Sequence, residues 1–267
     1  MTNLKTFCVT NVSNKNLELL DIDLVGVGQN KFSNKYIKCD NQINIQHKEK
    51  FYSELTFHYW FWKNKMNEFD NDTWIAFCQK RRFWIKGHNS TVHTIDELYN
   101  NLLREIPSKF NTFDAIICSP IKVSPAKPIK LLKRGWKNWI RDPSIIIDKR
   151  KHNLKLQFDM FHGYGNIQKA ANLLHEPENN EFIKYLDTKI EFNPNIMVIS
   201  KKNILEKWFK DVFEWLENCE KIFGFKNLQG YDTGRLYAYL AERYLSFWFN
   251  SKCKSTTGPW TFFDTTK

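Results

Sequence analysis

Apolar runs of strand length alternate along this chain with longer segments whose apolar residues recur every three or four positions. A buried strand followed by an amphipathic helix is the repeating unit of a domain built on a mainly parallel sheet. The alternation therefore predicts an α/β fold with helices flanking a central sheet, and it excludes all-α and all-β folds. We expect strands at Leu4–Thr10, Asp23–Val27, Thr73–Cys78, Phe113–Ser119 and Ile196–Ile199.

Helices are predicted where the apolar period lengthens. Phe51–Asn64 is apolar almost all round, so we expect it to be buried on most sides. Thr94, with a glutamate three positions later, has the sequence of a capping box, and its helix is predicted to run to Pro107. Two further helices are predicted, one opening near Ser200 and one after Thr233.

The chain shows neither an internal repeat nor a clear linker, which favours a single domain over residues 1–267. Within it we expect a first half at 1–121 and a second half at 154–267. Between them, residues 122–153 change composition, with prolines followed by a basic and aromatic stretch. This middle segment is predicted to be a crossover or a flap.

The charge balance favours anionic partners. Lys and Arg number 40 against 29 Asp and Glu, a net charge of +11, which suits nucleotide diphosphates, lipid headgroups or nucleic acid. No nucleic-acid module motif is visible, so a nucleic-acid partner is not expected. A secretion signal and a run of about 18 apolar residues are also lacking, which predicts a cytoplasmic protein. The cysteines form no CxxC pair, so no zinc site is expected.

Residues 130–141 interleave tryptophan, leucine and isoleucine with lysine and arginine in near-helical spacing. That composition is typical of a helix that lies on an anionic membrane. It predicts peripheral contact with the inner face of the cytoplasmic membrane. A flap over an active site and a plain surface helix are the alternatives.

Two clusters flank the strand Thr73–Cys78. Asp70–Asp72 has the DxD form of a metal-dependent sugar transferase, but it precedes the strand, whereas ligands of parallel sheets bind at the carboxyl ends. We therefore expect a turn there and no metal site. At the correct end stand Gln79–Arg82, in which Arg81 and Arg82 offer guanidinium groups that hold phosphate bidentately. The alternative is a solvated basic corner.

A second place for chemistry is the last predicted helix. Tyr239, Glu242, Arg243 and Ser246 share one stripe beside its apolar face. Bulky neighbours suggest partial burial, where a carboxylate paired with arginine accepts a proton from a hydroxyl. His162 precedes a glycine-rich loop and is a further candidate ligand contact.

Four strings resemble one known family in order and approximate spacing: Phe51–Asn64, Trp74–Phe83, Asn195–Ile199 and Ala241–Arg243. They are similar to the signatures YxELTxxYWxWKN, HYRRYF, NMFIM and SERL of bacterial capsular and lipopolysaccharide glycosyltransferases. The resemblance implies a GT-A-like, that is Rossmann-like, nucleotide-sugar transferase. Some members of that family are galactofuranosyltransferases.

The resemblance is carried over position by position. The matching residues are Glu54, Thr56, Tyr59, Trp60, Lys63 and Asn64 in the first signature, Arg81 and Arg82 in the second, Asn195 and Met197 in the third, and Glu242 and Arg243 in the last. Asp40–Asn44 resembles the family's GDNIS loop. Gln79, Lys80 and Ala241 depart from the usual His, Tyr and Ser, which implies a changed sugar or reduced activity.

The resemblance implies a donor that is a UDP-sugar, with UDP-galactofuranose among the candidates, bound by the first half. The acceptor, an oligosaccharide or a lipid-linked saccharide, is assigned to the second half. Glu242 is the expected base of an inverting transfer, and a divalent metal is not expected to be required. The contacts expected for nucleotide or diphosphate are Thr10, Asn11, Lys63, Arg81 and Arg82, and those for sugar or acceptor are Glu54, Tyr59, Trp60, Gln79, His162, Asn195 and Arg243.

Two functions of other classes stay open. The departures at Gln79 and Lys80 fit an inactive relative that only binds a glycan or a nucleotide. The net charge fits a basic adaptor at a membrane surface.

Overall fold

A computed structural model describes residues 2–87, 92–124 and 127–265 of the chain. They divide into two units. The first unit takes 1–119, 195–211 and 248–267, and the second takes 120–194 and 212–247. The expected boundary at 121 falls at the beginning of the second unit, whereas the expected C-terminal half is shared between both.

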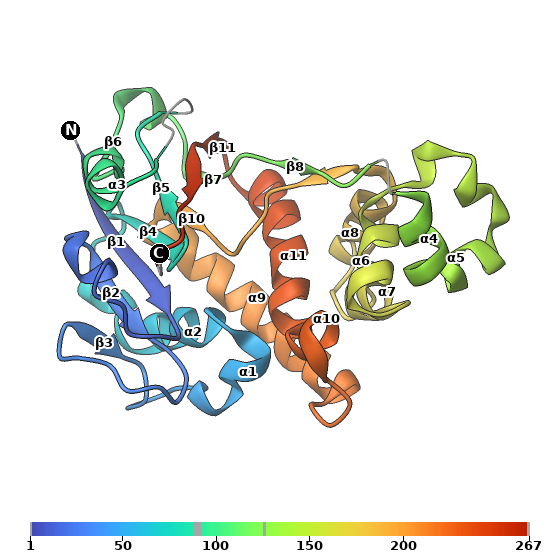
Figure 1. Cartoon of the computed structure of the whole chain (residues 1–267), viewed down its shortest axis with the longest axis horizontal. Helices are drawn as coiled ribbons and strands as arrows, with labels where there is room; N and C mark the ends of the chain where they lie inside the picture. Colours follow the sequence, from blue (N-terminus) through green and yellow to red (C-terminus); the bar gives the residue numbers. More distant parts are fainter. Residues whose placement is uncertain (1, 88–91, 125–126, 266–267) are drawn as a thin grey trace. The chain divides into compact units, whose positions relative to one another are not determined.

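The first unit is built on a sheet with strand order β11-β7-β10-β4-β1-β2-β3 (Figure 1). Neighbours on this path run parallel except where β10 is inserted antiparallel to β7 and β4. The predicted α/β fold with a mainly parallel central sheet is thus confirmed. The strands of the path are β1 (Thr2–Thr10), β2 (Asp23–Gly26), β3 (Tyr36–Lys38), β4 (Trp74–Gln79), β7 (Ala115–Cys118), β10 (Val198–Lys201) and β11 (Ser255–Gly258).

Three short strands extend this sheet at its margins. β5 (Arg82–Trp84) forms a hairpin with β4 and pairs with β12 (Trp260–Phe262), while β6 (Glu105–Ile106) pairs with the beginning of β1. All of these pairings are antiparallel. Because β5 pairs with both β4 and β12, the residues between β4 and β5 lie next to β12.

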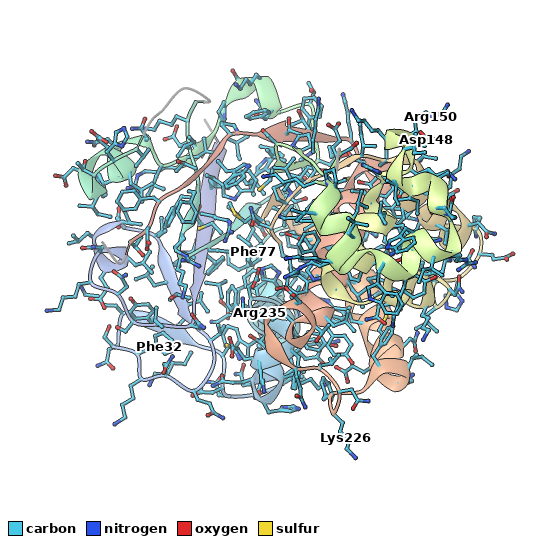
Figure 2. The ribbon with its side chains drawn as sticks, turned by 45° about the vertical axis from the view of Figure 1, so that its right-hand side comes forward. Phe32, Phe77, Asp148, Arg150, Lys226 and Arg235 are labelled. Carbon is cyan, nitrogen blue, oxygen red and sulfur yellow. The ribbon has the colours of Figure 1, made fainter. Side chains whose placement is uncertain are left out.

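Side chains of the sheet alternate between two covered faces. On one face Phe7 packs with Phe61 of α2 (Leu55–Asn64), with ring centroids 5.1 Å apart. Phe77, labelled in Figure 2, packs with Phe209 of α9 (Lys202–Phe223) at a centroid distance of 5.8 Å. On the other face Cys8 belongs to a buried cluster that also includes Leu98 of α3 (Ile95–Asn101). Burial on both faces explains the continuous apolar runs of the central strands.

Two predicted helices have wrong bounds. The aromatic helix is interrupted at Ser53, whose φ of 51° separates α1 (Glu49–Tyr52) from α2. The helix capped by Thr94 has the predicted capping box but ends at Asn101, because Leu103 donates its N–H to Trp84 O at 3.0 Å instead of continuing the helix. Pairing with distant strands outweighs the local apolar period here.

The second unit is mainly helical. Its two strands, β8 (Ile121–Lys122) and β9 (Glu191–Phe192), pair antiparallel. Phe182 packs with Phe247 at a centroid distance of 5.1 Å. Among its helices are α4 (Pro128–Arg134), α5 (Trp136–Arg141), α6 (Leu154–His162), α7 (Asn166–Ala171), α8 (Glu178–Thr188), α10 (Gly230–Gly234) and part of α11 (Leu236–Lys252). Within the described residues, none of the helices has the length and apolarity that a bilayer span requires.

His58 is a buried polar group inside the aromatic face of the first unit. It is 1% exposed, and its ring centroid lies 4.5 Å from that of Phe77 and 5.7 Å from that of Phe209. Burial lowers its pKa from 6.5 to about 3. His58 is therefore neutral in the folded chain at neutral pH.

We expect this histidine to make the protein sensitive to acid. Between pH 6.5 and about 3 the unfolded chain binds a proton that the folded chain does not. The unfolding free energy therefore falls with decreasing pH, by about 1.4 kcal/mol per pH unit, and no such slope arises from His58 above pH 6.5. Urea unfolding at several pH values should show a shallower slope for His58→Phe than for the wild type. The exposed His47→Gln serves as the control, and equal slopes in all three proteins would contradict a neutral His58.

Candidate functional site

Four parallel strands of the first unit end at the same edge of the sheet. The register pairs Val9 with Gln79, Thr10 with Gly26, and Gly26 with Lys38. The carboxyl ends of β1, β2, β3 and β4 therefore stand side by side. In open α/β sheets this edge is where ligands bind.

A cavity of about 410 Å³ opens at the ends of β2 and β3. Gly26 is required there, since a Cβ atom would lie 2.6 Å from the ring of Phe32, and Gly28 has a φ of +82°. The glycines thus let the backbone form one wall of the cavity, and the other walls are mostly polar. The lining residues of this edge cavity are Gly26, Gly28, Gln29, Asn30, Lys31, Phe32, Lys38, Asp40 and Gln46.

The turn between β4 and β5 brings basic groups to the same edge. Lys80 donates from Nζ to Asn11 Oδ1 at 2.7 Å, and its N–H bonds to Val9 O at 3.1 Å. Asn30 of the edge cavity donates to Asn11 O at 2.6 Å. Asn11 therefore connects the cavity wall to the turn formed by residues 79–82, which we name the basic turn.

The C-terminal strand and the residues after it fix the backbone of the basic turn. Phe263 donates its N–H to Arg81 O at 3.0 Å, and Thr265 donates its hydroxyl to Lys80 O at 3.1 Å. Thr265 is 1% exposed, and Asn14 and Asn16 donate to its carbonyl oxygen at 3.0 and 2.9 Å. Two main-chain oxygens of the turn, those of Lys80 and Arg81, are thus held by residues that follow β12.

The guanidinium groups of the basic turn are gathered on one aromatic ring. The guanidinium carbons of Arg81 and Arg82 each lie 5.9 Å from the ring centroid of Phe262. Arg82 also donates to Gln79 Oε1 at 3.2 Å, and the Gln79 amide donates to the Glu54 carboxylate. Arg81 is exposed and Arg82 is half-buried, so both remain accessible to an anion.

The structure thus brings together six of the predicted residues: Thr10, Asn11, Glu54, Gln79, Arg81 and Arg82. Thr10 is 2% exposed, and its hydroxyl donates to Val12 O at 2.7 Å, which closes the turn after β1. Glu54 stands where α2 begins and reaches Gln79. The direct contacts of these residues with a nucleotide or a sugar stay predictions.

Other predicted residues lie elsewhere. Lys63 is at the opposite end of α2 from Glu54, roughly 13 Å away along the helix axis, with Nζ 3.4 Å from the ring centroid of Trp62. Trp60 donates from Nε1 to Asn41 O at 3.1 Å and so fixes the loop that contains Asp40. Tyr59 packs edge-on against Trp62.

The third signature, Asn195–Ile199, lies in the first unit, where it leads into β10. Asn195 precedes β10 with a φ of 66°, a conformation that asparagine tolerates better than most residues. Met197 is fully buried and belongs to the same core cluster as Cys8. Contact of Asn195 with a sugar stays a prediction.

Asp70–Asp72 forms the predicted turn before β4. Thr73 donates its N–H to Asp70 O at 3.0 Å, and Asn71 O accepts from Asn203 N at 3.2 Å. The turn stands at the amino end of β4, whereas Gln79 stands at the carboxyl end. Within residues 2–87, 92–124 and 127–265, no three or more His, Cys, Asp or Glu side chains are grouped so that they could hold a metal ion.

In the second unit the pair Glu242 and Arg243 is anchored inside a polar and aromatic cluster. Arg243 is 2% exposed and donates to Glu242 Oε2 at 2.6 Å and to Gln157 Oε1 at 2.8 Å. Its guanidinium carbon lies 3.5 Å from the ring centroid of Phe192. Burial lowers the pKa of Arg243, and the neighbouring Glu242 carboxylate acts in the opposite direction. Glu242 is 18% exposed and is the more accessible member of the pair.

His162 is the last residue of α6 and contacts α11; these two helices also carry Gln157 and Arg243. Its ring stacks on Tyr239 with centroids 3.8 Å apart, and Nδ1 lies 2.9 Å from Asp232 O. Burial lowers the pKa of His162 to about 4, so the ring is neutral at neutral pH. A cationic contact from His162 to an anionic ligand is therefore not available at that pH.

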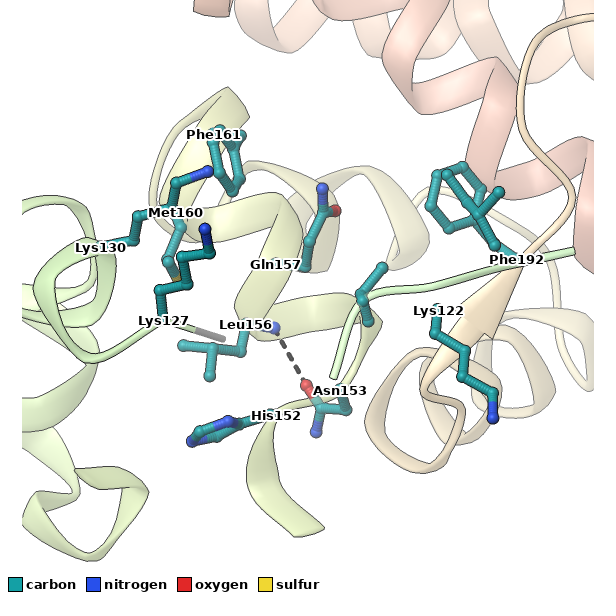
Figure 3. Close-up of a pocket in the computed structure, with 12 residues that line it drawn as sticks. Lys122, Lys127, Lys130, His152, Asn153, Leu156, Gln157, Met160, Phe161 and Phe192 are labelled. Atoms are coloured by element: carbon teal, nitrogen blue, oxygen red, sulfur yellow. Dashed lines mark hydrogen bonds between the residues drawn. The ribbon is translucent and has the colours of Figure 1, made fainter. Parts of the chain in front are cut away.

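A second cavity of about 290 Å³ lies within the second unit (Figure 3). Gln157 and Phe192, the two residues that Arg243 holds, are part of its wall. Sequence reasoning missed Gln157, because its partner is 86 positions away. The lining residues of this lysine cavity are Ile121, Lys122, Val123, Lys127, Lys130, His152, Asn153, Leu156, Gln157, Met160, Phe161 and Phe192.

Comparison with known proteins gives a family and a fold. A profile of the DUF4422 family, described as a domain of unknown function, matches residues 11–253. A solved chain described as the apo structure of the bifunctional glycosyltransferase WbbM superposes with a TM-score of 0.75 at 19% sequence identity. The match covers 98% of this chain and 45% of the WbbM chain, so this chain spans less than half of that protein. No curated protein matches at a significant level. The shared fold confirms the predicted GT-A-like architecture.

We expect Arg243 to be a structural anchor of the second unit. Arg243→Ala removes one partner of a buried ion pair and leaves Glu242 and Gln157 without its donors, which should lower the unfolding free energy by about 3 kcal/mol. Urea unfolding measures this loss. The matched control is the exposed Arg235→Ala, expected to cost less than about 0.5 kcal/mol. Equal stability of the two variants would show that the Arg243 cluster contributes nothing to the fold.

Proposed function

We propose that this chain, which belongs to the DUF4422 family, is a glycosyltransferase that moves a sugar from a nucleoside diphosphate to a saccharide acceptor. The likeness in fold to WbbM, which is described as a bifunctional glycosyltransferase, supports the proposal. The observation that carries it is the juxtaposition of the edge cavity and the basic turn at the carboxyl ends of the parallel strands.

The donor is proposed to bind in two parts. The nucleoside would enter the edge cavity, where amide side chains and the backbone at Gly26 and Gly28 offer hydrogen bonds. The diphosphate would lie on Lys80, Arg81 and Arg82. Negative charge develops on the diphosphate as the glycosyl bond breaks, and fixed cations at that point stabilise the transition state. UDP is the nucleotide that the family resemblance favours, with UDP-galactofuranose as the first donor to test.

The acceptor is proposed to use the lysine cavity. Phe161 and Phe192 offer flat apolar faces to a sugar ring, Gln157 offers an amide, and the lysines suit anionic groups on the saccharide. Glu242 is the proposed base, because its carboxylate is partly exposed and is oriented by a buried arginine. It would take the proton of the attacking hydroxyl in an inverting displacement.

We expect the basic turn to determine affinity for the diphosphate. Arg81→Ala removes an exposed guanidinium without touching the backbone bonds that hold the turn, so it should weaken UDP binding by about tenfold while the fold is unchanged. Calorimetric titration with UDP measures the change. The exposed Lys109→Ala, in the same unit, is the matched control. Unchanged affinity in Arg81→Ala, or no UDP binding by the wild type, would contradict the assignment.

Glu242→Gln keeps the size of the side chain and removes the base. We expect it to slow glycosyl transfer by about 10²–10⁴-fold while UDP affinity stays that of the wild type. The exposed Glu217→Gln on α9 is the control and should transfer normally. Near-normal transfer by Glu242→Gln would remove Glu242 from this role.

The rival function is an inactive relative that binds a glycan or a nucleotide. The motivating observation is that Gln79 bonds to Glu54 and Lys80 bonds to Asn11, so both departures from the family signature are engaged in the site. Release of UDP from a panel of UDP-sugars, with and without a metal chelator, separates the two. Binding without release from any sugar would favour the inactive relative.

A further inference from the structure

Exposed apolar side chains are concentrated in one stretch of the second unit, residues 127–151. Of the fourteen large apolar residues exposed among those described, six lie in this basic-apolar segment. Soluble proteins seldom gather exposed apolar groups in this way unless the patch meets a partner. The six are Ile129 (67% exposed), Leu132 (53%), Trp136 (48%), Ile140 (59%), Ile146 (49%) and Ile147 (85%).

The segment is folded, and its inner residues are already used. Leu131 and Ile145 are buried with Leu156 and Met160 of α6. Gly135 joins α4 to α5, and a Cβ atom there would lie 2.8 Å from Leu131 O, so the two short helices need glycine at their junction. Leu131 and Ile145 therefore complete the packing on α6, whereas the six apolar residues named above stay exposed and can contact a separate apolar surface.

The same segment carries most of the excess positive charge. It has nine Lys and Arg against two Asp, a balance of +7 within a whole-chain charge of +11. Both acids are paired inside the segment, Asp148 with Arg150 at 2.9 Å and Asp142 with Lys151 (Figure 2 labels Asp148 and Arg150). Lys130, Lys133 and Lys137 are exposed between the apolar residues.

We propose that the basic-apolar segment docks the protein on the surface of an anionic bilayer. An anionic lipid surface offers both things that the segment lacks: hydrocarbon for the isoleucines and tryptophan, and phosphate for the lysines and arginines. Nucleic acid offers the charge but no hydrocarbon. The two helices have seven and six residues, which is too short to cross a bilayer. They would therefore lie in the plane of the interface.

Docking has a consequence for the lysine cavity. Lys127 and Lys130 belong both to the segment and to the wall of that cavity, so a docked protein would hold the cavity at the lipid surface. A saccharide attached to a membrane lipid would then reach it. This consequence rests on the proposed function, whereas the docking itself does not.

The test is sedimentation of the full chain with vesicles at low salt. We expect binding to vesicles of equal parts phosphatidylcholine and phosphatidylglycerol, weaker binding as salt is raised, and little binding to phosphatidylcholine alone. Ile129→Ser with Ile147→Ser should weaken binding by at least about tenfold. Lys133→Glu with Lys137→Glu should do the same.

Matched control pairs have the same chemistry outside the segment. Leu19→Ser with Ile222→Ser changes two apolar residues that are each 59% exposed, and Lys207→Glu with Lys210→Glu changes two exposed lysines of α9. Both control pairs should bind vesicles more tightly than the corresponding segment pairs. Failure of the wild type to bind anionic vesicles would overturn the proposal, as would equal binding by segment and control variants. UDP binding, measured on the same proteins, reports on the proposed function separately.

Discussion

The parallel register of β3, β2, β1 and β4 is the constraint on which the rest of the candidate donor site depends. It brings Lys38, Gly26, Thr10 and Gln79 to one edge, although they are far apart in the sequence. The main chain of the basic turn is held by Phe263 and Thr265. These bonds hold the backbone of the turn, while its side chains bond within the site, Lys80 to Asn11 and Arg82 to Gln79.

Buried charge organises the second unit in a different way. Arg243 is enclosed, pairs with Glu242 and positions Gln157 and Phe192 in the wall of the lysine cavity. A buried ion pair seldom adds net stability, yet removal of one partner is costly. In this structure the buried guanidinium fixes a carboxylate and two cavity residues in one geometry. Arg243, which the sequence predicts as a sugar or acceptor contact, is buried against these neighbours in the structure.

The elements that the sequence predicts correctly are those whose structure depends on residues close together in the chain. β1 and β4 and the capping box at Thr94 were predicted because burial on both faces and side-chain capping leave signatures within a few residues. The break at Ser53, the early end of α3 and the antiparallel β10 depend on partners elsewhere in the chain. The roles of Phe262, Thr265 and Gln157 were missed for the same reason. The sequence predicts Arg81 and Arg82 because guanidinium groups that follow a buried strand stand at the carboxyl edge of a parallel sheet, and their contact with a diphosphate stays a prediction.

The proposed function depends on binding of the donor diphosphate at the carboxyl edge of the sheet. A crystal structure of the protein with UDP tests it most directly. We expect the pyrophosphate to lie against Lys80, Arg81 and Arg82, with the nucleoside in the cavity beside Gly26 and Gly28. A nucleotide bound at another place, with this edge empty, would contradict it.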